Sequence, residues 1–234
     1  MATRREILKT GLFGTAALGF AANQTGQAHA EGLAFLQNVN LRGARSALDG
    51  GLRPGAPDDQ SRKFQRIIDQ AVSRREPLFI PAGDYRVSNI NLPAGAHLAG
   101  VPGATRLLYT GGGHLIACEN ADQITLTGIT FDGGNRALAE YAPGLITASQ
   151  VAQLVLRDCI IGGSSKVGAY LERCGGEIST STIRGAAGLA GIHSVEANRL
   201  AIRDNRIEDC ANGGIYIWRW VPGDDGTQVQ GNRV

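Results

Sequence analysis

Short stretches in which apolar and polar residues alternate recur along the second half of the chain. They are "ITLTGITFDGG" from 124, "LVLRDCIIGG" from 154, "GEISTSTIRG" from 176, "LAIRDNRIED" from 200 and "TQVQGNRV" from 227. Their shared aliphatic position is Leu126, Leu156, Ile178, Ile202 and Val229, at steps of 30, 22, 24 and 27 residues. Alternation with period two predicts β-strands, and recurrence at this spacing predicts a repeat architecture.

A second strand is predicted before each of these, which gives an independent test of the repeat. Its strands begin at Leu115, Leu145, Ala169, Ile192 and Ile215, at steps of 30, 24, 23 and 23 residues. Two series that advance together indicate one coil of chain per repeat, and stacked coils bury a column of side chains that no single repeat could bury alone. The pattern therefore predicts an all-β fold, a parallel β-helix.

A corner follows each aligned strand and supports the stacking. The corner column is Ile129, Cys159, Ser181, Asn205 and Asn232. An asparagine in a turn can bond neighbouring backbone, and here also its equivalent one coil away. We therefore predict a structural role, and no catalytic role, for Asn205 and Asn232.

One convincing helix precedes the repeats. In "GAPDDQSRKFQRIIDQAV" the apolar residues Phe64, Ile67, Ile68, Ala71 and Val72 recur at helical spacing. Asp58 or Asp59 stands where an N-cap is expected. A strand is expected at 78–80, a tight turn at 81–83 and a second strand at 85–87, with the helix lying on the coils.

The N-terminus has the layout of an export signal. Charged residues at 3–9 ("TRREILK") precede a weakly apolar run from 11 to 22 and the small-residue sequence "AHA" at 28–30. The run is shorter than the roughly 20 residues that cross a bilayer, so no permanent membrane anchor is expected. The segment resembles twin-arginine signals of the pattern S/T-R-R-x-hydrophobic-L-K. That resemblance implies the twin-arginine export machinery as a partner, cleavage after Ala30, and a periplasmic or secreted protein made of residues 31–234.

Charge excludes one class of partner. The whole chain has a net charge of +2, and residues 1–30 carry Arg4, Arg5 and Lys9 against Glu6, which is also +2. The part from residue 31 is therefore near neutral, and nothing electrostatic favours nucleic acid or an anionic membrane.

The cysteines do not have metal-ligand spacing. Cys118, Cys159, Cys174 and Cys210 contain no C-x-x-C pair. An oxidising destination permits disulfides in three connectivities, which the sequence leaves open. We favour buried, reduced side chains that pack as small hydrophobes.

The helix and the following strands resemble a known family. "GAPDDQSRKFQRIIDQA" and "PLFIPAGDYRVSNINLPAGAHLAGVPGATRLL" are similar to the N-terminal part of the pectate-lyase superfamily domain, over most of residues 40–234. Pro81, Gly83 and Tyr85 are its most specific element. Together with the export signal, the chain more narrowly resembles the twin-arginine-translocated repetitive proteins. The resemblance implies a single-stranded right-handed parallel β-helix with one N-terminal capping helix, and it implies a fold better than a reaction.

Catalytic motifs of that superfamily are not found here. The N-x-D, D-D, G-H-G and R-x-K set of the galacturonan hydrolases is missing, and Asp224 and Asp225 read as an exposed turn. No cofactor is evident from the residues. The resemblance to calcium-dependent pectate lyases leaves calcium open.

The predicted registers place a group of candidate site residues on one outward face. Alternation sends Ile146, Tyr170, His193 and Tyr216 outward in one column and Ala148, Glu172, Val195 and Trp218 in the next, with Arg173, Glu196 and Arg219 at the rim. Aromatic faces can stack on sugar rings, while acids, histidine and arginine can handle protons and carboxylates. We expect catalytic roles for His193, Glu172 and Arg219. The substrate-binding roles fall to Tyr170, Tyr216, Trp218, Arg173 and Glu196.

Each of these residues also has a structural interpretation. Glu172 with Arg173, or Glu196 with Arg219, could form surface ion pairs of little energetic value. The loop at 220–226 could cover the tyrosines and Trp218. For a hydrolase the nearest acid pair is Glu172 with Asp224 or Asp225.

Two functions remain open at this point. One is an exported enzyme that cleaves polysaccharide as a uronate lyase or a glycoside hydrolase. The other is a non-catalytic solenoid that binds cell-envelope glycan or serves as a scaffold. The chain stops at 231–234 within a corner-and-strand element, so we expect a truncated sequence whose further coils could carry catalytic residues.

Overall fold

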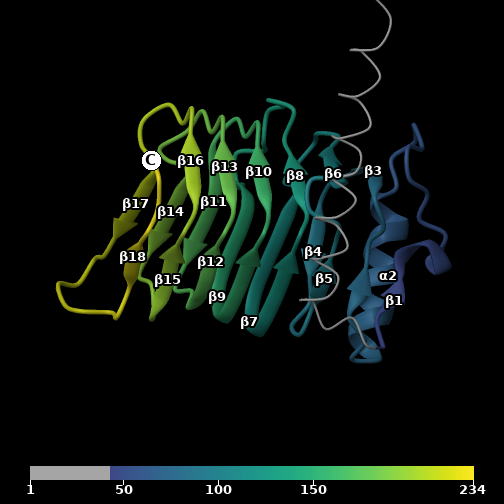
Figure 1. Ribbon diagram of the computed structural model, residues 1–234, viewed down its shortest axis with the longest axis horizontal. Helices are drawn as coiled ribbons and strands as arrows, with labels where there is room; N and C mark the ends of the chain where they lie inside the picture. Colours follow the sequence, from purple (N-terminus) through teal and green to yellow (C-terminus); the bar gives the residue numbers. More distant parts are fainter. Residues whose placement is uncertain (1–42) are drawn as a thin grey trace, which may run out of the picture. The chain divides into compact units, whose positions relative to one another are not determined.

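A computed structural model describes residues 43–234 of the protein. The predicted export signal lies outside these residues. The described part forms one compact unit in which strands stack along the long axis and the helix α2 (Ser61–Ser73) lies at one end (Figure 1). A short 3-10 helix, η1 (Ala47–Gly50), precedes it.

All strand pairs in the described part are parallel, and they form two sheets. The larger contains β1 (Arg45–Ser46), β2 (Leu78–Phe79), β4 (Ile90–Leu92), β5 (His97–Ala99), β7 (Ile116–Thr127), β9 (Gly144–Arg157), β11 (Val167–Glu172), β12 (Gly176–Ser179), β14 (Ile192–Val195), β15 (Leu200–Arg203), β17 (Ile215–Trp218) and β18 (Gln228–Gln230). The smaller contains β3 (Gly83–Val87), β6 (Thr105–Tyr109), β8 (Thr130–Asp132), β10 (Ile160–Gly162), β13 (Thr182–Arg184) and β16 (Arg206–Glu208). Each strand therefore pairs with the strand one coil away, which confirms the predicted parallel β-helix.

One coil shows how the chain turns. β11 runs to a bend at Arg173, β12 follows, a corner at Thr180 and Ser181 leads into β13, and a loop returns to β14. The bend residues of successive coils, Asn120, Gln150, Arg173 and Glu196, all have φ between 50° and 54°. Left-handed backbone in a non-glycine residue is uncommon. Its recurrence at one position in four coils shows that the bend itself requires this conformation.

The aligned aliphatic column is confirmed in full. Leu126 pairs with Leu156, Leu156 with Ile178, Ile178 with Ile202, and Ile202 with Val229. The first four members are at most 1% exposed. Burial of this much aliphatic surface in stacked layers is the main stabilising term of the fold.

The predicted corner column forms a hydrogen-bonded ladder. Asn205 Oδ1 accepts from the Ser181 amide at 3.0 Å, and Asn232 Oδ1 accepts from the Asn205 amide at 3.0 Å. Asn205 Nδ2 also donates to the Ile178 carbonyl and to Asn232 Oδ1, both at 2.9 Å. The buried Asn205 therefore links three successive coils, which confirms its structural role.

The second predicted column is partly wrong. Ala169, Ile192 and Ile215 pair as expected, but the partner of Ala169 in the preceding coil is Ile146 and not Leu145. Ile146 and Ala148, predicted to point outward, are fully buried. Thr147 and Ser149 take the outward register positions beside Tyr170 and Glu172. Gly144, Leu145 and Ile146 are all buried at the start of β9, so alternation does not mark the register there.

The helix packs as its pattern predicts. Phe64, Ile67, Ile68 and Ala71 are at most 1% exposed, and α2 contacts η1, β3 and β4. The N-cap residue is Gln60 and not Asp58 or Asp59; the Gln60 side chain makes no capping bond and instead bonds the backbone of Arg53. Asp59 still contributes, since its Oδ1 accepts from the Ser61 amide at 2.9 Å.

All four cysteines lie in the described part and are free thiols. Burial raises the pKa of Cys118 and of Cys159 to about 12. These two therefore stay protonated near neutral pH and pack as small apolar groups, as favoured from the sequence.

Replacement of Asn205 by alanine tests the corner ladder. Asn205→Ala leaves the Ser181 amide and the Ile178 carbonyl buried without their partner, so the free energy of unfolding should fall by about 2–4 kcal/mol. Chemical denaturation measures this loss. Asn198→Ala, at an exposed position of the same coil, is the control and should change the free energy by less than about 0.5 kcal/mol. Equal effects of the two variants would contradict a stabilising role of the corner ladder.

Candidate functional site

An outward column of aromatic rings crosses β11, β14 and β17. Tyr170, His193 and Tyr216 are register partners on these strands. The ring centroids of Tyr170 and His193 lie 5.3 Å apart, and those of His193 and Tyr216 lie 5.2 Å apart, both edge to face. The predicted grouping of these three side chains is therefore present.

Two tryptophans extend the column along the last strand. Trp218 stacks on Tyr216 with ring centroids 6.3 Å apart and planes 7° apart, and Trp220 meets Trp218 edge to face at 6.0 Å. Tyr216, Trp218 and Trp220 are 40%, 43% and 70% exposed, so the loop at 220–226 does not cover them. We call Tyr170, His193, Tyr216, Trp218 and Trp220 the aromatic face. Trp220 was not predicted as a member, although the spacing 216, 218, 220 continues the alternation of the strand.

Burial among the rings affects the titration of the central histidine. Desolvation lowers the pKa of His193, so its imidazole is neutral at pH 7. Desolvation, with the charge of Glu172 as a smaller cause, raises the pKa of Tyr170. A neutral imidazole can accept a proton, which is the property that a general base requires.

Glu172 and Arg173 lie beside the aromatic face at the end of β11. Glu172 shares its register with Val195 and Trp218, and its Oε1 lies 3.9 Å from Nη1 of Arg173. Both side chains are more than one-third exposed, so this ion pair contributes little to stability. Both groups remain accessible to a ligand on the face.

Glu196 and Arg219 do not pair with each other. The Glu196 carboxylate accepts from the backbone amide of Trp220, which ties the start of the loop to the preceding coil. Arg219 Nη1 donates to the Gly223 carbonyl at 2.9 Å and lies 3.7 Å from Asp225 Oδ2. These two predicted site residues thus hold the loop that carries Trp220.

The two aspartates of the loop are also engaged. Asp224 Oδ1 accepts from the Gly226 amide and Asp225 Oδ1 from the Thr227 amide, both at 2.8 Å. Both are turn contacts, as predicted from "PGDDG". Within residues 43–234, no three His, Cys, Asp or Glu side chains lie close enough together to hold a metal ion.

The family model for a right-handed beta helix region matches residues 144–234. A candidate glycosyl hydrolase from Parabacteroides merdae ATCC 43184 has a similar structure, with a TM-score of 0.64 at 12% identity, and the match covers 82% of this chain and 97% of that one. ORF18 of Geobacillus virus E2 gives 0.64 at 16% identity over 94% of this chain and 44% of its own. The catalytic domain of Agl-KA gives 0.57 at 15% over 75% and 34%. No curated protein sequence matches the chain.

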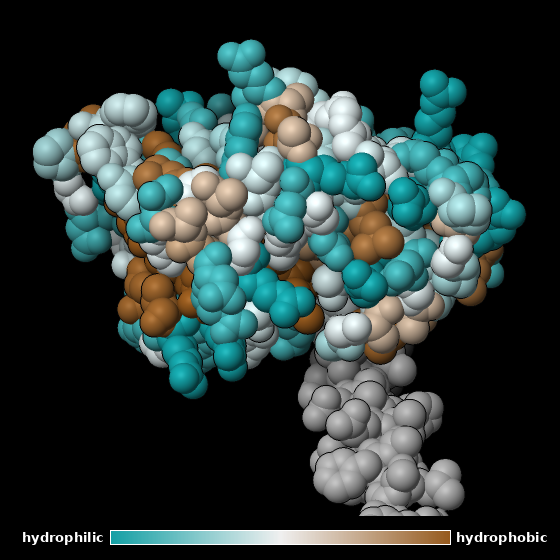
Figure 2. Space-filling model, turned by 90° about the horizontal axis from the view of Figure 1, so that it is seen from above, coloured by the Kyte–Doolittle hydropathy of each residue, from teal (hydrophilic) through white to brown (hydrophobic). Residues whose placement is uncertain are grey.

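The protein is a right-handed parallel β-helix. At these identities the likeness shows the fold alone, and the chain spans less than half of the second and third of those structures. Among the described residues of the β-helix, no helix is long and apolar enough to cross a membrane. Seen from above, hydrophilic side chains cover much of the β-helix, and hydrophobic ones form separate patches, one of them near the end that carries β17 and β18 (Figure 2). Exposed Ile217, Val229 and Val234 belong to this last coil.

The titration of His193 tests the packing of the aromatic face. The His193 pKa should lie below 6.5 and return toward 6.5 in Tyr216→Ala, because the variant opens one side of the imidazole to water. The imidazole NMR signals followed against pH measure this value. Trp220→Ala removes a ring that contacts Trp218 and should leave the His193 pKa unchanged. An unperturbed pKa in the unmodified protein would contradict the packing.

Proposed function

We propose that this protein binds polysaccharide through the aromatic face. The observation that carries the proposal is the row of five rings on one outward side of three adjacent coils, three of which are 40% to 70% exposed. Flat, exposed Tyr and Trp rings offer apolar faces to sugar rings and polar edges to their hydroxyls. The likeness in fold to a candidate glycosyl hydrolase supports the same class of ligand.

The second candidate function is cleavage of a uronate polysaccharide by elimination. The neutral His193 between two phenols favours it, with Glu172 and Arg173 beside them. His193 would take the proton on the carbon next to the uronate carboxylate, and Arg173 would bind that carboxylate. The bond to the leaving oxygen then breaks, a carbon–carbon double bond forms, and the Tyr170 hydroxyl gives its proton to the leaving oxygen.

Hydrolysis has less support from the geometry. An inverting hydrolase requires two free carboxyl groups across the bond that breaks. Asp224 and Asp225 make contacts inside their own loop, and Glu196 holds the Trp220 amide. Glu172 is therefore the one acid beside the face that we assign to chemistry, in the role of a group that orients or supplies a proton.

Tryptophan fluorescence tests glycan binding at this face directly. The chain contains two tryptophans, Trp218 and Trp220, and both belong to the aromatic face. Titration with neutral and uronate oligosaccharides should therefore shift or quench the emission. Trp218→Ala should weaken binding about tenfold, read from Trp220, because one stacking ring is lost.

Tyr141→Ala is the matched control for that titration. Tyr141 is 68% exposed but contacts His114 and not the aromatic column, so its loss should leave the affinity unchanged. The same incubations separate the two functions. Product that absorbs in the ultraviolet and disappears in His193→Ala supports elimination, and binding without product supports the non-catalytic solenoid. Emission that no glycan in the panel changes would overturn the proposal.

We also propose that the protein is exported through the twin-arginine pathway to the periplasm or beyond. The proposal rests on the sequence from Thr3 to Lys9. Replacement of Arg4 and Arg5 by lysine keeps the charge and should leave uncleaved precursor in the cytoplasm, measured by cell fractionation. The control is the same replacement at Arg74 and Arg75, a second arginine pair in the described part. Normal export of the first variant would contradict this route.

A further inference from the structure

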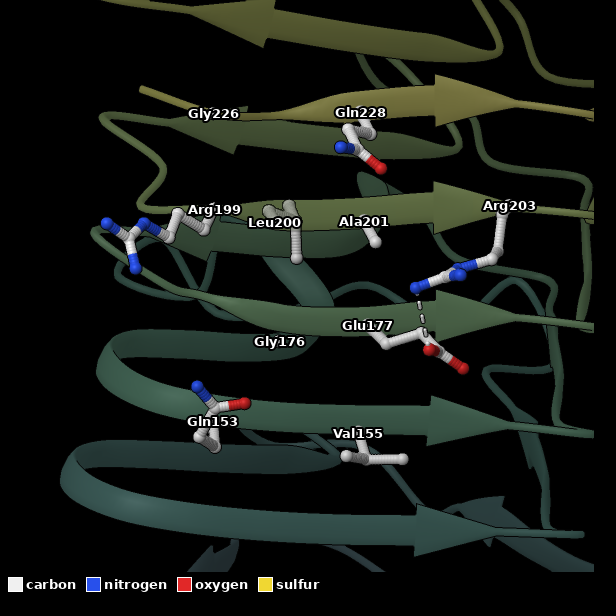
Figure 3. Close-up of a pocket in the computed structure, with 10 residues that line it drawn as sticks. All are labelled: Gln153, Val155, Gly176, Glu177, Arg199, Leu200, Ala201, Arg203, Gly226 and Gln228. Carbon is white, nitrogen blue, oxygen red and sulfur yellow. Dashed lines mark ion pairs between the residues drawn. The ribbon is translucent and has the colours of Figure 1, made fainter. Parts of the chain in front are cut away.

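A groove that is separate from the aromatic face crosses the larger sheet. It lies on the other side of the bend at Arg173 and Glu196. The groove has a volume of about 550 Å³ and runs over β9, β12, β15 and β18 (Figure 3). Val155, Glu177, Ala201 and Gln228 are register partners on these four strands, so the groove follows the direction in which coils stack. It shares no residue with the aromatic face.

Small residues make the hollow. The floor is formed by Val155 and Ala201, which project little from the sheet (Figure 3). Gly176 has φ of +102°, and a Cβ there would lie 2.2 Å from the Leu154 carbonyl oxygen. Neither the conformation nor the space admits a side chain at this position. Gly176 is therefore required by the backbone, and the depth of the groove comes from the short side chains of Val155 and Ala201.

An ion cluster forms one wall of the groove. Glu177 Oε1 lies 3.1 Å from Arg157 Nη2, and Glu177 Oε2 lies 3.1 Å from Arg203 Nη2. The Ser179 hydroxyl also donates to Glu177, and this bond with the two arginines lowers the pKa of that carboxyl. Figure 3 shows Arg203 reaching back along β15 toward Glu177. Each arginine side chain is about half exposed and uses one guanidinium nitrogen here, so other N–H groups remain for a ligand.

The charge of the groove is positive. Arg199 and Arg203 line the groove together with one carboxylate, Glu177, and Arg157 pairs with Glu177 from the neighbouring strand, so three arginines minus one acid leave +2 in and beside the groove. Glu177 is the one acid among the residues that line it. Since residues 31–234 together are near neutral, this is a local concentration of positive charge, and charge complementarity favours an anionic ligand.

We propose that this groove binds the carboxylate groups of an acidic polysaccharide that lies along the solenoid axis. The backbones of Arg157 and Arg203 lie two coils apart, about 10 Å at the usual strand spacing, and both guanidinium groups converge on Glu177. Their remaining N–H groups, on opposite sides of Glu177, can bind two carboxylates of one extended chain. Val155 and Ala201 offer an apolar floor to the C–H side of the sugars, and Gln153 and Gln228 can bond hydroxyl groups. Glu177 holds the guanidinium groups in place before the ligand arrives, which reduces the entropy lost on binding.

The chemistry of the groove favours a glycan over a single-stranded nucleic acid, the other common anionic polymer. Binding of single strands relies on aromatic side chains that stack on the bases. The residues that line this groove include no aromatic ring. The inference does not rest on the aromatic face, because the two surfaces lie on different strands and each can be removed without the other.

Calorimetric titration of the full chain with a hexamer of galacturonate tests the groove. The hexamer should bind with an affinity that falls as sodium chloride is raised, and any binding of cellohexaose of equal length at the aromatic face should be unchanged in Arg157→Gln and Arg203→Gln. Arg157→Gln and Arg203→Gln should each weaken hexamer binding at least tenfold, because each removes one charge-assisted contact. Arg203→Lys keeps the charge but not the fork and should lose part of the affinity.

Two controls separate this site from other effects. Arg184→Gln removes an exposed arginine on β13 of the smaller sheet and should leave hexamer affinity unchanged. Arg203→Gln should weaken hexamer binding by the same factor in the Trp218→Ala background as in the original protein. Thermal unfolding verifies that every variant is folded. Arginine variants that weaken cellohexaose binding as much as hexamer binding, tighter binding of an oligonucleotide, or arginine variants that bind the hexamer as well as the original protein would each overturn the proposal.

Discussion

The corner ladder fixes one coil of this protein against the next. Ser181, Asn205 and Asn232 pass hydrogen bonds between coils at the point where the chain turns from the larger sheet to the smaller one. A slip of one residue would place these polar groups in the core without partners and would turn the aliphatic column outward. The ladder and the buried column therefore specify the same register. This register determines which side chains lie next to each other on every outer surface of the solenoid.

That register converts a loose sequence repeat into two different surfaces. On β11, β14 and β17 it aligns rings, and on β9, β12 and β15 it brings Arg157 and Arg203 to either side of Glu177. The left-handed bend at Arg173 and Glu196 separates the two surfaces. One surface is apolar and aromatic, the other is cationic with an apolar floor. We infer that a long glycan binds to one of these surfaces, or that two glycans bind to both, while the core between the surfaces stays unchanged.

The sequence predicts the fold well because the repeat and the burial pattern coincide. The column from Leu126 to Val229 and the corner from Ser181 to Asn232 are confirmed, since each position is strictly inward or strictly in a turn. The register of Ile146 and Ala148 is wrong by one residue, because three consecutive residues are buried where β9 begins. Alternation carries no information in such a segment.

The site residues are less predictable for another physical reason. Tyr170, His193 and Tyr216 meet because backbone pairing alone brings them together. The contacts of Glu196 and Arg219 depend on the path of the loop, which no periodicity describes. The cluster around Glu177 was missed, although alignment of Arg157, Ser179 and Arg203 in the same repeat would have placed two arginines around an acid.

The most direct test of the account is whether residues 23 apart in sequence touch in solution. Nuclear Overhauser effects between selectively labelled rings measure this in the folded protein. The account predicts cross-peaks from the His193 ring to the rings of both Tyr170 and Tyr216, whose centroids lie 5.3 and 5.2 Å away. Cross-peaks to neither tyrosine, or from His193 to buried core side chains in their place, would contradict the register on which both surfaces depend.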